Sequence, residues 1–574
     1  MALTFRIAGV KYSLISRKGS LVNGPTANSL MSEGTKYLSA QNFTAAKTCF
    51  LKVIEAYANE SEAYFLLSWI AHNENQAHVA CDYLKKANAL QPFNKKYLSG
   101  LANVYSQLGE FHKAIELYQG YLRMDGSPAE VYYNYASTLI KVKELGLAFE
   151  AFQKAISLDP TQLPYYMALG QLLYHVHKNR DAQKVYLSAL SRGLKSEGLY
   201  QNIAKLHADF GELEEAKGIL NQASIAYPDN LAFIYRLSML ESDVLTTTLF
   251  DSLNTHTDES LSLDNQFYRY WLLSKFSDKE NAASEEMQFL AKAHSIFKEL
   301  NAFAFDKEFY LESLPKFDLP RIPNIEALQD KASKALEPIF IVGIPRCGST
   351  LLENIICSGP KPVLKGEETG AIFHAVTQSL QKNTPESHAQ DLWLNIREQA
   401  KALYQSSNLL QENTRFTDKS LENIFLVDLI LALYPKAKII YCVRKPLASV
   451  VSIMKNNMVT LPWAHDLNDI LEYVDNSLKT IAKWNEIYPE SILTVQYENL
   501  VTEPEVESKK LMSFCDLEWH ESCLNFHENK YMMSKTASHI QIRDKINQNA
   551  LTTYQKYKPF FEQYSSKYPW LSEA

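Results

Sequence analysis

The sequence predicts two kinds of structure in one chain: an all-α solenoid, followed by a P-loop-like α/β domain with a parallel sheet. Two observations carry this prediction. Small residues recur every 34 positions through the N-terminal half, which is typical of stacked helical pairs. In the C-terminal half, short apolar runs alternate with helical segments, which indicates parallel strands joined by crossover helices.

Composition limits the class of protein. The chain has 574 residues, so more than one domain is expected. Its net charge of −7 argues against a globally basic surface for nucleic acid. The seven cysteines are scattered and show no zinc spacing, so we expect reduced thiols, no metal and a cytoplasmic protein. No apolar run approaches the ~18 residues of a membrane span.

The repeat is supported by three registers. The first register holds only small residues and the second only alanine, so the two helix backbones of a pair can approach closely. A bulky ring often follows the alanine one helical turn later. We expect this ring to fill the gap to the next pair. The third holds Pro92, Gly126, Pro160 and Pro228, where helices should stop. The first two registers are Gly34, Ser68, Ala102, Ala136, Gly170 and Ala204, and Ala46, Ala80, Ala114, Ala148, Ala182 and Ala216.

These registers resemble the tetratricopeptide repeat. Six repeats are expected, starting near Asn28, Ser61, Asn94, Pro128, Gln162 and Glu197. A seventh, starting near Asn230, fails because Phe250 stands where alanine should be. The array is either a spacer or, as we favour, a surface that binds a protein or peptide acceptor or a partner. Its candidate contact residues, most of which would also serve packing, are Tyr132, Tyr133, Tyr135, Tyr165, Tyr166, Tyr174 and Tyr200.

Four segments follow from these patterns. Residues 1–27 form a poorly specified leader, and residues 28–242 hold the repeats. Residues 243–335 form an irregular helical connector, in which 266–273 and 285–305 have helical periodicity and can form one more pair. Residues 336–574 form the α/β domain, whose expected strands include 339–342, 363–364, 438–444 and 492–498.

The stretch at 338–350 predicts a buried strand, a tight loop and the start of a helix. Gly343 and Gly348 bracket four residues, and Ser349 and Thr350 follow. This is the outline of a phosphate loop, in which backbone N–H groups and a helix N-terminus hold an anion. The usual loop has lysine where this chain has Ser349. A nucleoside triphosphate, and hence a kinase, is therefore disfavoured, and a nucleotide with a shorter 5′ anionic tail is expected.

Several later segments join the loop in one resemblance. Gly366-Glu367-Glu368-Thr369, Asp418-Lys419, Val443-Arg444 with Ser452, and Tyr497-Glu498-Asn499-Leu500 resemble the sulfotransferase fold in their order and spacing. The nearest branch is the tyrosylprotein-sulfotransferase-like group, and within it the bacterial proteins that join tetratricopeptide repeats to such a domain. The resemblance covers residues 338 to about 557 and implies the donor 3′-phosphoadenosine 5′-phosphosulfate, with no metal.

The resemblance also implies roles for individual residues. Glu368 would be the general base, with Glu367 as second candidate and as a group that orients Arg346. Lys419, together with the loop donors and Arg346, would stabilise charge on the leaving oxygen, and Ser538 would touch the bridging oxygen. The donor's 5′-phosphosulfate would be held by Arg346, Cys347, Gly348, Ser349 and Thr350. Its remaining contacts would be Arg444 and Ser452 to the 3′-phosphate, Tyr497 to the adenine and Arg543 to a phosphate.

One departure concerns the acceptor. Animal members of the family follow the Gly-Glu-Glu-Thr run with arginines that select acidic peptides, where this chain has Gly370 and His374. Three hypotheses therefore remain open. The first is a sulfotransferase that acts on a hydroxyl, with protein tyrosine as the leading acceptor. The second is a saccharide or small-alcohol sulfotransferase. The third is a repeat scaffold with an inactive sulfotransferase domain.

Overall fold

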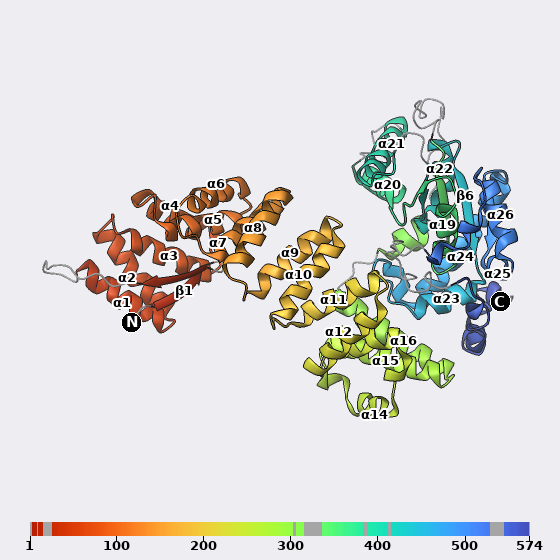
Figure 1. Cartoon of the computed structure of the whole chain (residues 1–574), viewed down its shortest axis with the longest axis horizontal. Helices are drawn as coiled ribbons and strands as arrows, with labels where there is room; N and C mark the ends of the chain where they lie inside the picture. The colour runs from red at the N-terminus through yellow and green to blue at the C-terminus, as the bar shows by residue number, and fades with distance from the viewer. Residues whose placement is uncertain are drawn as a thin grey trace. The chain divides into compact units, whose positions relative to one another are not determined.

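The computed structural model is mainly helical, with one parallel sheet near the C-terminal end, which confirms the predicted fold class (Figure 1). It describes residues 3–7, 10–14, 26–301, 306–314, 336–382, 389–410, 415–528 and 545–572. The chain divides into two compact units, Met1–Leu206 and His207–Ala574. In the described residues, no helix combines the length and apolar character needed to cross a bilayer.

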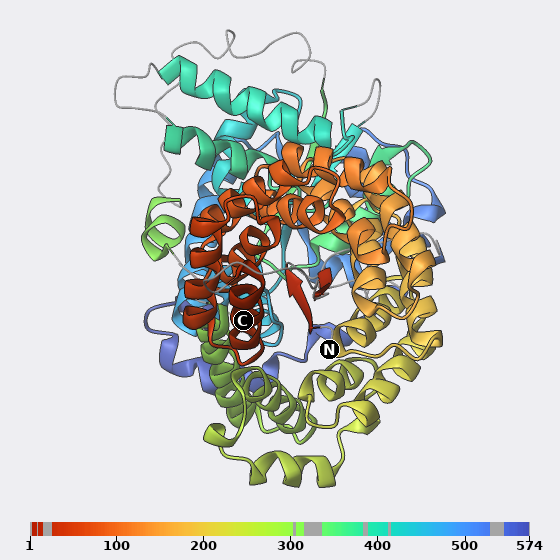
Figure 2. The same cartoon turned by 90° about the vertical axis from the view of Figure 1, so that its left-hand side faces the viewer.

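The first unit is a row of antiparallel helical pairs whose first helices begin at the predicted positions. Successive pairs stack side by side (Figures 1 and 2). An antiparallel pair of strands, β1 (Leu3–Ile7) and β2 (Val10–Leu14), precedes them, in the segment that the sequence left as a poorly specified leader. The helices are α1 (Ala27–Ser39), α2 (Phe43–Ala56), α3 (Ser61–Asn73), α4 (Ala77–Leu90), α5 (Lys95–Gln107), α6 (Phe111–Leu122), α7 (Ala129–Lys141), α8 (Leu145–Leu158), α9 (Leu163–His175) and α10 (Asn179–Ser191), and the division between the units falls inside α11 (Glu197–Asp209).

Close contact between the two helices of a pair explains the small residues. A Cβ atom added to Gly34 would lie 2.6 Å from Cε1 of Phe50. A Cβ on Gly170 would likewise fall on the ring of Tyr186. Each of these two rings therefore covers the small residue of its own pair. The alanines of the second register are fully buried or nearly so, since a larger side chain would separate the helices.

A fourth 34-residue register appears only in the backbone. The turn inside each pair contains one residue with positive φ, namely Gln41, Asn75, Gly109, Lys143, His177 and Gly211. This left-handed conformation closes the first helix and suits glycine best. Only two of the six are glycine, so residue type did not reveal the register.

Most of the tyrosines proposed for a binding face pack inside the array. Tyr135, Tyr165, Tyr166 and Tyr200 are buried. Tyr133 is half-buried, and its ring lies 5.1 Å from that of Tyr165. The tyrosine pattern in this region is therefore chiefly a packing pattern.

The second unit begins with helices that precede the sheet in the sequence. They are α12 (Leu213–Ala226), α13 (Leu231–Leu240), α14 (Thr247–Thr255), α15 (Leu263–Lys279) and α16 (Ala283–Asn301), with 3₁₀ turns η1 (Ser242–Val244) and η2 (Asp258–Ser260). The seventh repeat stops after its first helix, as predicted, because α13 packs on α15 through Tyr235 and Trp271, whose ring centroids are 5.9 Å apart. Helices α15 and α16 form the additional pair expected in the connector.

The sheet has five parallel strands in the order β4-β5-β3-β6-β7. The chain starts at the central strand, fills one side of it and then the other, as in doubly wound folds. The strands are β3 (Ile339–Gly343), β4 (Val363–Leu364), β5 (Arg415–Asp418), β6 (Lys438–Val443) and β7 (Ile492–Gln496). The last strand is shorter than predicted, because Tyr497 and Glu498 open a helix instead.

The helices and turns around the sheet follow the predicted alternation. They are η3 (Phe309–Ser313), α19 (Ser349–Cys357), α20 (Ala371–Lys382), α21 (Ala389–Ser406), η4 (Leu421–Leu426), α22 (Val427–Leu433), α23 (Pro446–Met454), η5 (Pro462–His465), α24 (Leu467–Ile487), α25 (Tyr497–Thr502) and α26 (Pro504–Phe514). Short turns η6 (Glu521–Cys523), η7 (Phe526–Glu528), η9 (Asn549–Leu551), η10 (Gln555–Tyr557), α27 (Lys558–Phe561), η11 (Glu562–Tyr564) and η12 (Pro569–Leu571) complete the unit.

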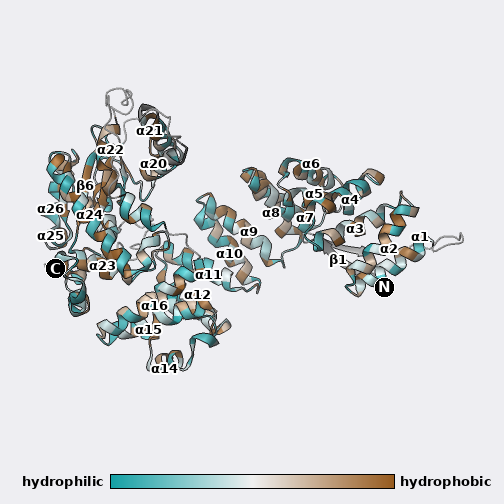
Figure 3. Ribbon diagram, turned by 180° about the vertical axis from the view of Figure 1, so that it is seen from behind, coloured by the Kyte–Doolittle hydropathy of each residue, from teal (hydrophilic) through white to brown (hydrophobic). Residues whose placement is uncertain are grey.

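Alternate residues of the central strand enter two separate cores. Ile339 and Ile341 pack with α19 and α26 on one face. Phe340 and Val342 belong to a larger core on the other face, which includes α15, α16 and α20 to α24. Strand β6 is accordingly hydrophobic on both faces (Figure 3). The pair α15–α16 thus shares a core with the sheet rather than acting as a loose connector.

We predict that Gly170→Ala lowers the free energy of unfolding by about 1–3 kcal/mol, the usual cost of overpacking. The added methyl group would overlap the Tyr186 ring. Gly120→Ala is the matched control, because Gly120 also lies within a helix of the first unit but has open space around it. The free energy of unfolding of this variant should rise by roughly 0.5–1 kcal/mol. Urea unfolding followed by circular dichroism measures both. Equal shifts would contradict the close-contact explanation.

Candidate active site

A cavity of about 1000 Å³ opens at the carboxyl ends of the central strands. Parallel strands all end at the same edge of their sheet, and this is where doubly wound folds bind ligands. Every residue around the cavity lies in the second unit. The lining includes these predicted site residues: Arg346, Gly348, Ser349, Thr350, Glu368, Arg444, Ser452 and Tyr497.

The predicted phosphate loop connects β3 to α19. Gly348 has φ of 105° and caps the N-terminus of α19. A Cβ atom on Gly348 would lie 2.5 Å from Cδ2 of Tyr497. The loop therefore depends on glycine twice, for its backbone angle and for the ring packed against it. The first backbone N–H groups of a helix such as α19 are of the kind that bind anions in other proteins.

Cys347 differs from its neighbours in the loop. Its side chain is buried in the core with Cys442, whose Sγ donates to the Cys347 carbonyl oxygen at 3.3 Å. The thiol does not line the cavity. Any contact of Cys347 with a ligand would therefore come from its backbone.

Two arginines meet beside the loop. Nε of Arg346 donates to Oγ of Ser452 at 3.1 Å, and Nη1 of Arg444 donates to the Arg346 carbonyl oxygen at 3.1 Å. Burial, with the nearby positive charge of Arg444, lowers the pKa of Arg346 to about 10. Two cations held this closely repel each other, so an anion bound between them would be stabilised.

Tyr497 lies at the start of α25 rather than at the end of a strand. Its ring contacts Gly348 on the loop, and the guanidinium carbon of Arg444 lies 4.9 Å from the ring centroid. A cation over an aromatic ring is an attractive arrangement. Four predicted residues, Arg346, Arg444, Ser452 and Tyr497, are thereby brought together with the loop.

The predicted base and the predicted lysine form an ion pair. Nζ of Lys419 lies 2.9 Å from Oε1 of Glu368, with the lysine side chain 1% exposed and the glutamate side chain 57% exposed. Burial lowers the pKa of Lys419, but the negative Glu368 and Glu353 outweigh it and the net shift is upward. Lys419 is therefore an ammonium ion at neutral pH. Only Glu368 of the pair lines the cavity.

Glu353 is a buried neighbour of this pair that the sequence did not single out. Its Oε1 accepts hydrogen bonds from Oγ1 of Thr417 at 2.8 Å and from the backbone N–H of Glu367 at 2.9 Å. Burial raises its pKa, although Lys419 and Lys365 act in the opposite direction. Its position three residues after Thr350, on the first turns of α19, is the only signal that could have indicated it.

Asp418 holds the turn that carries Glu368. It accepts hydrogen bonds from the hydroxyls of Tyr404 at 2.6 Å and Thr369 at 2.8 Å, and from the backbone N–H of Ser420 at 2.9 Å. Asp418 is thus a positioning residue for Glu368.

Glu367, which was expected to orient Arg346, has a carboxylate oxygen 3.4 Å from Nζ of Lys365.

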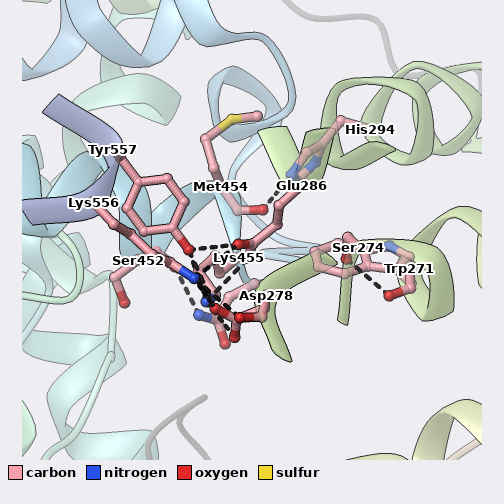
Figure 4. Close-up of polar contacts among 11 residues, drawn as sticks. Trp271, Ser274, Asp278, Glu286, His294, Ser452, Met454, Lys455, Lys556 and Tyr557 are labelled. Atoms are coloured by element: carbon pink, nitrogen blue, oxygen red, sulfur yellow. Dashed lines mark hydrogen bonds and ion pairs between the residues drawn. The ribbon is translucent and has the colours of Figure 1, made fainter. Parts of the chain in front are cut away.

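An ion network around the buried Glu286 forms another part of the cavity wall (Figure 4). Lys455, at the end of α23, lies 2.8 Å from Asp278 of α15 and 3.0 Å from Glu286 of α16. The hydroxyl of Tyr557 donates to Glu286 at 2.6 Å, and Lys556 pairs with Asp278 at 2.6 Å. Lys455 and Tyr557 line the cavity. The network ties the helical pair to the helix that carries Ser452.

Sequence reasoning did not find this network, because its members are far apart in the chain. Asp278 and Glu286 precede the phosphate loop, whereas Lys556 and Tyr557 lie near the C-terminal end. Two other predicted site residues, Ser538 and Arg543, lie outside the described residues.

Comparison with known proteins agrees with this arrangement. A family profile described as "Sulfotransferase family" matches residues 338–521. A "Tetratricopeptide repeat" profile matches residues 61–94, and "Cilia and flagella-associated protein 70 middle TPR-like domain" matches residues 98–223. An uncharacterized protein of Aquifex aeolicus is 26% identical over 69% of this chain, which spans only 53% of that protein.

The relatives include animal proteins that carry a functional name. A putative protein-tyrosine sulfotransferase of Caenorhabditis briggsae is 23% identical over 38% of this chain and 80% of its own length. Protein-tyrosine sulfotransferase 2 of Gallus gallus is 29% identical over 34% of this chain and 55% of its own length. The chain therefore carries a tetratricopeptide-repeat region followed, from residue 338, by a sulfotransferase-family domain.

Proposed function

We propose that the protein is a sulfotransferase that moves a sulfuryl group from 3′-phosphoadenosine 5′-phosphosulfate to a hydroxyl acceptor. One observation carries the proposal: a phosphate loop without its lysine, two arginines and Glu368, which pairs with Lys419, meet at one cavity. The relatives named as protein-tyrosine sulfotransferases support the reaction class. The presence of Arg346, Glu368 and Arg444 around the cavity argues against an inactive scaffold.

The residues around the loop fit this donor. The phosphosulfate would be held by the loop N–H groups and Arg346, in the space that a Cβ on Gly348 would distort. Arg444 and Ser452 would hold the 3′-phosphate, and Tyr497 would contact the base. Arg346 and Arg444 supply two permanent positive charges where the donor carries its anionic groups.

The proposed reaction needs positioning and charge stabilisation more than covalent catalysis. The donor supplies an activated sulfuryl group whose leaving group is a phosphate. The acceptor oxygen forms a bond to sulfur while the bond from sulfur to the phosphate oxygen breaks. Glu368 takes the hydroxyl proton. Once Glu368 is neutral, the Lys419 ammonium no longer balances a carboxylate and can stabilise charge on the leaving oxygen.

Protein tyrosine is the proposed acceptor, because the named relatives act on it. We further propose that the repeats recruit the acceptor or a partner protein. A saccharide or small alcohol is the alternative acceptor, since Gly370 and His374 replace the arginines that read acidic peptides in animal members.

We predict that the full chain binds 3′-phosphoadenosine 5′-phosphate at least tenfold more tightly than ATP, because the loop lacks a lysine for a γ-phosphate. Arg444→Ala should weaken binding tenfold or more, a loss of about 1.4 kcal/mol or greater. Titration calorimetry measures the dissociation constants. Arg397→Ala, at a residue paired with Glu398 on α21, is the control and should bind normally. Equal affinity for the two nucleotides would contradict the donor assignment.

We also predict that Glu368→Ala reduces sulfur-35 transfer from labelled donor by 10²-fold or more, the usual scale for a general base. Binding of 3′-phosphoadenosine 5′-phosphate should change less than threefold, because Glu368 is not among the loop contacts. Glu367→Ala, in the same turn but paired with Lys365, serves as the control and should retain turnover. Survival of transfer in Glu368→Ala would show that another group takes the proton.

A further inference from the structure

One region of the cavity, next to Glu368, is built from three elements that the site assignments above do not use. Tyr310 comes from η3, Phe373 and His374 from α20, and Leu421 and Glu422 from η4. All five line the cavity together with Glu368. We call this set of five residues the acceptor pocket, because a hydroxyl that gives its proton to Glu368 must stand beside it.

Two aromatic rings form one side of the acceptor pocket. The ring centroids of Tyr310 and Phe373 are 6.2 Å apart with planes inclined by 32°. The Phe309 ring packs edge-on against Tyr310, with ring centroids 5.2 Å apart, and contacts Phe373, with ring centroids 6.1 Å apart. These contacts hold the two rings in place. Such a surface favours a flat apolar group. A phenol has a ring of this kind and also carries a hydroxyl.

Glu422 adds a carboxyl group to the same pocket. It lies in the first turn of η4, three residues after Lys419, and is half-buried. Burial raises its pKa, and the negative charges of Glu368 and Asp418 raise it further. Glu422 in turn contributes, after burial, to the raised pKa of Tyr310. The geometry agrees, because the side chains of Glu422, Glu368, Tyr310 and Phe373 line the same cavity.

The charges that face the acceptor pocket are unequal. Glu368 and Glu422 bring two carboxyl groups. Among the described residues, the lysines of the cavity and its surroundings are Lys419, which pairs with Glu368, Lys455, which pairs with Asp278 and Glu286, and Lys545. The arginines of the cavity stand at the phosphate loop. A carboxylate on an acceptor would therefore meet repulsion here, whereas an ammonium group would be attracted.

We propose that the acceptor pocket selects a phenolic hydroxyl flanked by neutral or cationic groups, and that Glu422 is the residue that sets this preference. This inference rests on the proposed sulfotransferase function and specifies its acceptor class. It is the reverse of a requirement for acidic residues around a target tyrosine. Two charges that are separated by about the length of one side chain in a partly buried site change the affinity for the acceptor by roughly tenfold.

Three phenols of similar size test the proposal, because they differ mainly in charge. They are tyramine, which is cationic, N-acetyltyramine, which is neutral, and 3-(4-hydroxyphenyl)propionate, which is anionic. Sulfur-35 transfer by the full chain gives kcat/KM for each. We expect tyramine to exceed the propionate by tenfold or more in the natural protein. Glu422→Gln should reduce this ratio about tenfold, and Glu422→Lys should invert the preference.

Matched measurements separate charge from folding. Glu490→Gln removes an exposed carboxylate of the same unit that does not line the cavity, and it should leave the ratio unchanged. Circular dichroism and the affinity for 3′-phosphoadenosine 5′-phosphate establish that each Glu422 variant is folded. An unchanged ratio in folded Glu422→Gln, a natural preference for the propionate, or loss of transfer to all three phenols in Glu422→Gln alone would each overturn the proposal.

A binding measurement distinguishes failure of this proposal from failure of the sulfotransferase function. The three phenols are titrated into the protein saturated with 3′-phosphoadenosine 5′-phosphate, where no reaction is possible. Tighter binding of tyramine that depends on Glu422 supports the pocket even if no transfer occurs, and in that case the proposed reaction fails alone. Equal binding of all three phenols overturns the pocket whatever the activity.

Discussion

The packing of Tyr497 on Gly348 is the contact on which the rest of the site depends. Gly348 has no Cβ, so the ring can lie against the phosphate loop, and its positive φ turns the chain into α19. The same ring supports Arg444, which donates to the carbonyl oxygen of Arg346. A single methyl group on Gly348 would disturb the loop, the ring and both arginines together. Glycine is therefore required here by packing as well as by backbone geometry.

A second constraint lies outside the segment that matches the sulfotransferase profile. Helices α15 and α16 precede that segment, yet their side chains belong to the core on one face of the sheet. Asp278 and Glu286 hold Lys455, at the end of the helix that carries Ser452. Removing Lys455 would leave the buried Glu286 side chain with less compensating charge, which is destabilising. The helical pair is thus part of the structure that forms the cavity.

Prediction from the sequence succeeded where the evidence is local or periodic. The 34-residue registers gave the first helix of each repeat, and the apolar runs gave the strands, because both patterns follow from the repeat period of regular structure. It was less successful at element ends: Tyr497 was assigned to a strand but opens a helix. Glu353, Glu422 and the Lys455 network were missed, because nothing in their immediate sequence shows which distant side chains they meet. The predicted roles of the loop residues, Glu368 and Lys419 stay predictions.

The sequence by itself determined the class of each half and the chemistry available to it. The period requires stacked helices, and the absent lysine in the loop argues against a nucleoside triphosphate. The tertiary structure decided which groups act together. It paired Glu368 with Lys419, placed Glu353 beneath them, and brought Glu422 and two aromatic rings to the same cavity. The reason is physical: strand and helix periods are local properties of the chain, whereas burial and charge pairing arise only when distant segments pack together.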